Sequence, residues 1–158
     1  MQAQQSSGQS KFTTLNHLIE TAKDGESGFE AAAKDCSDAD LKHVFMQFSR
    51  ERGKFVAELQ SFVEKKGEES EQSGTLTAAV HRGWINLRSS LSARDNLAVL
   101  EECERGEDYA VQQYQDAVLK QQLGSAAVVV ERQRDQVVKA HDQIKNLRDK
   151  LNVSTPAT

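Results

Sequence analysis

Residues 38–66 read DADLKHVFMQFSRERGKFVAELQSFVEKK, the stretch with the clearest periodicity in the chain. Large side chains recur there at alternating steps of four and three residues, which is the spacing of the buried seam in a helical bundle. The seam positions are Leu41, Phe45, Phe48, Arg52, Phe55, Leu59 and Phe62, with the only polar interruption at Glu51 and Arg52. The stretch therefore predicts a long helix that packs into a bundle.

The composition of the whole chain favours long helices. Its 158 residues are enough for one domain with a single sizeable core. The one proline, Pro156, lies in the C-terminal tail, and aromatic residues make up only 6% of the chain. Because proline interrupts helices, a proline-free body of this kind predicts an all-α protein.

Capping residues and glycines divide the chain into five expected helices. These cover residues 12–34, 38–66, 75–91, 95–123 and 125–151, and residues 1–11 and 152–158 are expected to be a disordered and a frayed tail. Short turns make two antiparallel hairpins of the four long helices, whereas 28 residues separate one hairpin from the other. The prediction is a single four-helix bundle over residues 12–151, with a long crossover connection that contains a short extra helix.

The charge of the chain limits its partners. A net charge of −4 at pH 7 argues against nucleic acid and anionic membranes, because both attract a basic surface. Residues 1–10 lack the features of a secretory signal, and no apolar run approaches the roughly 20 residues of a membrane span. We expect a cytoplasmic protein without nucleic-acid or membrane partners.

The two cysteines, Cys36 and Cys103, form no C-x-x-C motif, so reduced thiols are expected. Both are placed near the same end of the bundle if the crossover returns the chain there. A redox pair and two unrelated buried thiols remain alternatives, and we favour the second.

Polar residues fall at mid-bundle positions that should be apolar. Counting along the helices puts Glu107 and His141 each 17 residues from the turn at Gly124, so they lie level. Glu51 follows the first turn by about 14 residues, which brings it to a similar height. The sequence therefore predicts one layer that holds Glu51, Glu107 and His141.

This layer has two interpretations. Glu51, Glu107 and His141 could hold one Fe, Mn or Zn ion, since carboxylate and imidazole suit these metals. Alternatively they form a buried polar network in which the Lys54 ammonium neutralises Glu51 or Glu107. Buried carboxylates require such compensation. We favour the network, with the Tyr114 hydroxyl bonded to a carboxylate.

The layout resembles the ferritin-like superfamily, whose di-iron bundles take one Glu from each of two helices and a Glu-x-x-His motif from each of the other two. Its six ligand positions fall here on Ala22, Glu51, Lys54, Glu107, Val138 and His141. Three of the six keep a ligand residue, so the resemblance implies a degenerate di-metal site.

A narrower resemblance covers nearly all of residues 13–149. It rests on Leu15-Asn16, Asp24-Gly25, Gly28-Phe29, His81-Arg82-Gly83-Trp84, Gly106-Glu107-Asp108-Tyr109-Ala110 and His141-Asp142-Gln143-Ile144. This pattern is similar to a bacterial family of small ferritin-like bundles known only as a domain of unknown function. It implies the fold and no activity.

Function is the least determined feature of the sequence. No phosphate-binding loop, Ser-His-Asp arrangement or nucleotide signature is present. We expect a non-catalytic structural or interaction protein, with a link to stress implied by the ferritin-like resemblance. A homo-oligomer, most simply a dimer, is expected through apolar outer positions at Val44, Val56 and Val63. A metal-binding protein or metal-dependent oxidoreductase is the alternative.

Overall fold

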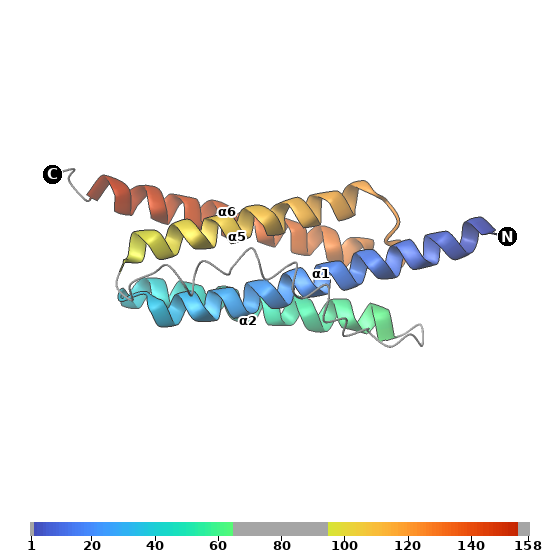
Figure 1. Ribbon diagram of the computed structural model, residues 1–158, viewed down its shortest axis with the longest axis horizontal. Coiled ribbons are helices and arrows are strands. Elements are labelled where there is room, and N and C mark those ends of the chain that lie inside the picture. The colour runs from blue at the N-terminus through green and yellow to red at the C-terminus, as the bar shows by residue number, and fades with distance from the viewer. Residues whose placement is uncertain (1, 65–94, 155–158) are drawn as a thin grey trace.

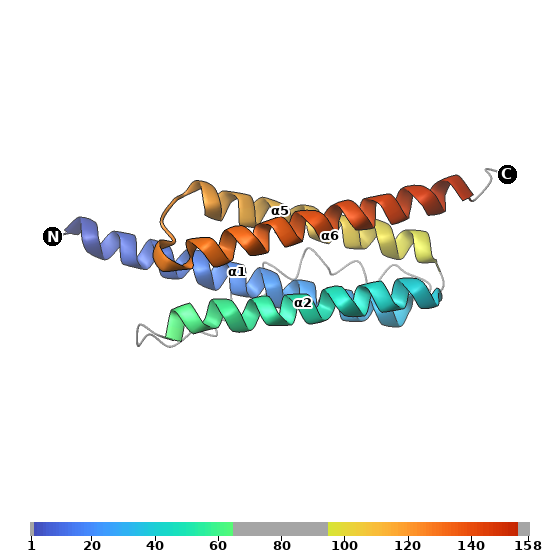
Figure 2. The same cartoon turned by 180° about the vertical axis from the view of Figure 1, so that it is seen from behind.

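The computed structural model describes residues 2–64 and 95–154 (Figure 1). This part of the chain contains four α-helices: α1 (Gln2–Asp35), α2 (Ala39–Glu64), α5 (Asn96–Leu119) and α6 (Ala127–Ser154). A short 3-10 helix, η2 (Gly124–Ala126), precedes α6. The hairpin of α1 and α2 packs side by side with the hairpin of α5 and α6 (Figures 1 and 2). The predicted all-α four-helix bundle is confirmed.

The two hairpins are joined by a crossover. In Figure 1, α2 ends at the opposite end of the bundle from the start of α5. The backbone N–H of Ser37, in the turn between α1 and α2, donates to Oδ1 of Asn96 at 2.8 Å, so that turn lies beside the first residue of α5. The chain therefore re-enters the bundle at the end opposite to the one it left. The extra helix expected at 75–91 lies outside the described residues.

Helix bounds differ from the expected ones mainly at the N-terminus. The helix α1 begins at Gln2, about ten residues before the expected start, so the stretch expected to be a tail is helical. This stretch contains no proline, and adding residues to an existing helix is far easier than nucleating one. At the other hairpin, α5 ends at Leu119 and the turn uses positive φ angles at Gln121 and Gly124, 53° and 56°.

The starts of α2 and α5 are capped as expected. The Asp38 carboxylate accepts the backbone N–H of Leu41 at 2.9 Å, and the Asp95 carboxylate accepts that of Ala98 at 3.2 Å. These bonds satisfy N–H groups that have no partner inside the helix. The two caps fix where α2 and α5 begin.

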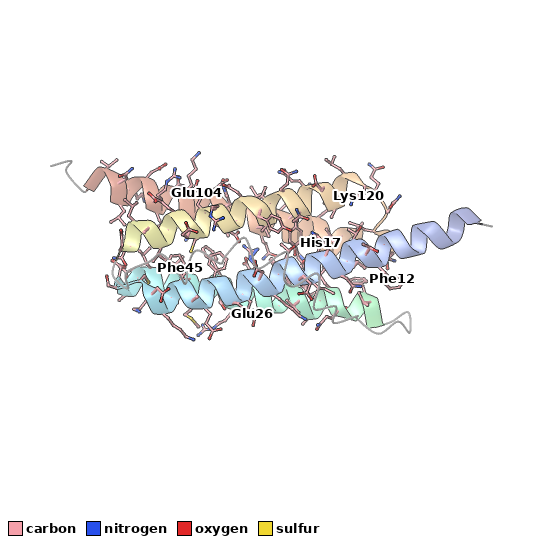
Figure 3. The ribbon with its side chains drawn as sticks, in the orientation of Figure 1. Phe12, His17, Glu26, Phe45, Glu104 and Lys120 are labelled. Carbon is pink, nitrogen blue, oxygen red and sulfur yellow. The ribbon has the colours of Figure 1, made fainter. Side chains whose placement is uncertain are left out.

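The core consists of two apolar clusters along the bundle. One contains Leu15, Leu18, Ile19, Phe55, Leu59, Tyr114, Val130 and Val137. The other contains Phe29, Phe45, Phe48, Leu100, Cys103 and Ile144. Figure 3 places Phe45 toward the end where α5 begins, and His17 and Lys120 toward the opposite end. Ring centroids of Phe29 lie 6.3 Å from Phe45 and 5.2 Å from Phe48, which makes the second cluster strongly aromatic.

Two of the valines expected on the outside are buried. Val56 is 9% exposed and Val63 is 1% exposed, and both pack in the core, whereas Val44 is half-buried. The expectation was wrong for Val56 and Val63 because the apolar face of α2 is wider than a single seam. These two residues give no support to a dimer interface.

Among the described residues, none of the helices combines the length and the apolar character needed to cross a membrane.

Phe45→Ala should lower the free energy of unfolding by about 3–5 kcal/mol, because it leaves a cavity in the aromatic cluster. The matched control is Leu119→Ala, at a position 77% exposed, which should change it by less than about 0.5 kcal/mol. Chemical denaturation measures both. Equal losses in the two variants would contradict the assignment of the core.

Candidate functional site

A buried ion pair joins the two hairpins between the two apolar clusters. Nη2 of Arg52, on α2, lies 2.7 Å from Oε2 of Glu107, on α5. The two side chains are 2% and 1% exposed. A charge-assisted hydrogen bond of this length in a low-dielectric interior is a strong contact between the hairpins.

The neighbours of Arg52 fix its side chain in place. Its guanidinium carbon lies 5.6 Å from the centre of the Phe29 ring and 5.3 Å from that of Phe55, so one ring from each apolar cluster contacts it. On α1, a Cβ added to Gly25 would lie 3.3 Å from Cγ of Arg52. Glycine at this position therefore gives the arginine stem room to pass α1.

The pair leaves several polar atoms unsatisfied. Within the described part of the chain, Nε and Nη1 of Arg52 and Oε1 of Glu107 have no hydrogen-bond partner. Burial raises the pKa of Glu107 from its ordinary 4.5 to about 7, and this outweighs the opposing effect of Arg52 and His141; Glu51 and Asp108 raise it further. The Glu107 carboxyl group therefore titrates near neutral pH.

A small cavity adjoins the pair. It has a volume of about 10 Å³ and is lined by Asp24, Arg52, Glu107, Tyr109 and Tyr114, among others. A cavity of this size with polar walls accommodates about one water molecule. It leaves no room for an organic substrate.

The structure places the predicted site residues in one layer without joining them into one cluster. Arg52, next to Glu51, contacts Glu107, and His141 contacts Asp108, next to Glu107, so the three predicted residues lie at similar heights. However, Nε2 of His141 lies 2.5 Å from Oδ1 of Asp108, and Nδ1 lies 3.3 Å from Oδ1 of Asp142. The imidazole therefore bonds to surface carboxylates rather than to Glu107.

Several features of this layer oppose the binding of a metal ion. The guanidinium of Arg52 bonds directly to Glu107, and a dication beside it would be repelled. Groups of three or more His, Cys, Asp or Glu side chains placed to hold a metal are absent from residues 2–64 and 95–154. The fourth corner of the layer holds Ala22, which offers no ligand atom.

The cation of the network is Arg52, whereas the sequence reasoning assigned this role to Lys54. Lys54 is exposed, and its charge acts on the pKa of Glu51. The signal for Arg52 was present in the sequence, because Arg52 occupies a seam position between Phe48 and Phe55. A side chain at that position points into the bundle.

A second polar contact was missed. The Tyr114 hydroxyl donates to Oε1 of Gln133 at 2.7 Å, where a carboxylate was expected, and the Gln133 amide donates to the Phe55 carbonyl at 3.4 Å. Gln133 is fully buried because it lies on the inward face of α6, together with Val130, Val137, Ala140 and Ile144. His141, which was expected in the mid-bundle layer, is only partly buried, as is Arg134 next to Gln133.

Other polar and thiol side chains of α5 and its neighbours have ordinary roles. Glu104 forms an ion pair with Arg148 across the α5–α6 hairpin. Cys36 and Cys103 are buried free thiols in the same apolar cluster, at the end of the bundle where they were expected. Burial is the main cause that raises the pKa of both thiols, so neither is activated as a nucleophile.

The raised pKa of Glu107 predicts a pH-dependent stability. Between about pH 4.5 and 7 the folded protein retains a proton that the unfolded chain has lost, so stability falls as pH rises through this window and levels off above it. The expected amplitude is on the order of 3 kcal/mol. Denaturation of the wild type and of Glu107→Gln across this range measures it: the difference between them should change with pH. A constant difference would contradict the buried, proton-binding carboxyl.

Comparison with known proteins places the chain in a family. Residues 11–120 match the model of a family described as a domain of unknown function, DUF2383. The matched region takes in Arg52 and Glu107 and ends at the close of α5, before α6. Among curated proteins, none matches this chain. Because the match covers most of its length, the chain belongs to the DUF2383 family.

Proposed function

We propose that this protein is a non-catalytic helical bundle that acts as a structural or interaction protein through its outer surface. In this proposal the Arg52–Glu107 pair stands where a ferritin-like bundle would hold its metal. The observation that carries the proposal is the 2.7 Å contact between Nη2 of Arg52 and Oε2 of Glu107, both buried. The Arg52 guanidinium neutralises the buried Glu107 carboxylate at this position, as a metal ion would.

The available space also supports a role at the surface. The cavity beside the ion pair measures about 10 Å³, whereas small-molecule sites usually measure several hundred. A depression of about 420 Å³ lies between α2 and α6 on the outside of the bundle, but seven of its nine lining residues are polar or charged, whereas small-molecule pockets are mostly apolar. Binding to another macromolecule is the use that this distribution of space favours.

The link to bacterial stress physiology and the cytoplasmic location are part of the same proposal. The first rests on the ferritin-like resemblance alone. The second rests on the absence of a C-x-x-C motif and on the two buried free thiols.

A metal-binding role is the second candidate. Oε1 of Glu51 and Oε1 of Glu107 are buried and lack hydrogen-bond partners among the described residues, and such oxygens are suitable ligands for Fe, Mn or Zn. Against it stand the bond from Arg52 to Glu107 and the bonds of His141 to Asp108 and Asp142. One measurement distinguishes the two candidate functions.

Metal analysis separates them. Protein purified without a metal-affinity tag is incubated with Fe(II), Mn(II) or Zn(II), dialysed and analysed by mass spectrometry. The wild type should retain no more metal than Glu107→Gln, because the guanidinium already neutralises the carboxylate. Glu101→Gln, at an exposed position on the same helix, is the matched control. One equivalent bound by the wild type and by the control, and lost in Glu107→Gln and His141→Ala, would establish the metal-binding role instead.

A further inference from the structure

The depression between α2 and α6 is a groove on one face of the bundle. These two helices form the face turned toward the viewer in Figure 2, and they contact each other less than the helices within each hairpin do. The groove has a volume of about 420 Å³. Its lining from α2 includes Gln47, Glu51, Lys54 and Glu58, and its lining from α6 is Arg132 and Gln136.

The four α2 residues form a regular stripe. Gln47, Glu51, Lys54 and Glu58 follow one another at steps of four, three and four residues, which is the spacing by which one helix contacts another. Gln47 and Lys54 are exposed, and Glu51 and Glu58 are half-buried. The stripe therefore lies on the flank of α2, beside the seam that faces the core.

We propose that this groove is the contact surface for a second copy of the chain, with the two α2 helices antiparallel and Glu51 of each copy opposite Lys54 of the other. The same register places Gln47 of each copy opposite Glu58 of the other. The two-fold axis of this dimer lies beside α2, level with Arg52 and Gly53. Both copies then use the same surface, as in a closed dimer. Parallel helices would bring Glu51 against Glu51 and Lys54 against Lys54, so charge selects the antiparallel pairing.

The state of Glu51 in one copy supports this pairing. Its Oε1 is shielded from solvent and has no hydrogen-bond partner among the described residues. Burial raises the pKa of Glu51 despite the opposing charges of Arg52, Lys54 and Lys139. The Glu51 carboxylate also lines the groove, so an ammonium group of the second copy can approach it from that side and offset the cost of its partial burial.

Glu58, which this register places opposite Gln47, is also held in position. Oε2 of Glu58 pairs with Arg132, and Oε1 accepts the Gln133 amide at 3.3 Å, so this carboxylate is held in a fixed position in the groove. The Gln47 amide of the second copy then donates to an ordered acceptor. Arg50, the remaining charged residue of the lining, is exposed, and its side chain reaches solvent.

This inference rests on the proposed function, since it assigns the surface through which the bundle acts. The most discriminating position is Gln47, because it is exposed and the change of residue leaves the core untouched. Gln47→Lys puts an ammonium opposite Glu58 and should tighten self-association, whereas Gln47→Glu puts two carboxylates together and should weaken it, each by about tenfold. Sedimentation equilibrium over a wide concentration range gives both dissociation constants.

A charge exchange tests the register itself. Glu51→Lys and Lys54→Glu should each weaken self-association by about tenfold or more, because each makes the facing pairs alike in charge. An equimolar mixture of the two variants should form a heterodimer, in which every facing pair is again opposite. Lys145→Glu and Glu101→Lys, at exposed positions outside the groove lining, are the controls and should associate as the wild type does.

A wild type that stays monomeric at every concentration would overturn the proposal. So would two Gln47 variants that associate equally, or a mixture that forms no heterodimer. Circular dichroism checks that each variant is folded; if Glu51→Lys is not, the Gln47 variants and Lys54→Glu still decide the question. Metal analysis of the same wild-type sample is independent, so a monomer without metal would remove only the groove assignment and leave the proposed function standing.

Discussion

The bundle depends on how a single buried arginine is compensated. Arg52 projects from α2 into the interior, where a guanidinium without a partner would cost several kcal/mol. The only acidic side chain that bonds to it within the described residues is Glu107, from the other hairpin. The contact therefore ties the relative height and rotation of the two hairpins to one ion pair, in addition to the general tendency of apolar faces to pack.

Several local features follow from this pair. The rings of Phe29 and Phe55 cover the guanidinium, Gly25 leaves space for the arginine stem, and a cavity of about one water volume lies beside the carboxylate. Both apolar clusters therefore end at the same polar layer. In the function that we propose, the arginine takes the place of a metal ion in this layer, and for this reason we look to the outer surface for function.

The sequence predicted the architecture well because its signals are strong and local. The seam of α2, the caps at Asp38 and Asp95 and the long separation between the hairpins were sufficient for a bundle with a crossover. Heights along the helices were also correct, since each residue adds a constant rise of 1.5 Å. Counting therefore placed Glu107 level with His141.

Rotation about the helix axis was less predictable. An error of one residue turns a side chain by about 100°, and on α6 the fully buried position is Ala140 instead of His141. The role of Lys54 was inferred from the ligand pattern of the ferritin-like resemblance, whereas the apolar seam alone pointed to Arg52. The helix expected at 75–91 lies outside the described residues.

A double-mutant cycle on Arg52 and Glu107 tests the central claim most directly. Arg52→Met and Glu107→Leu are made singly and together, and the free energy of unfolding is measured by denaturation at about pH 8, above the pKa of Glu107 of about 7, where the pair carries both charges. Each single variant should lose about 3–5 kcal/mol because it strands a buried charge, whereas the double variant should be close to the wild type. Losses that simply add would show that the two side chains do not stabilise each other, and would contradict the account.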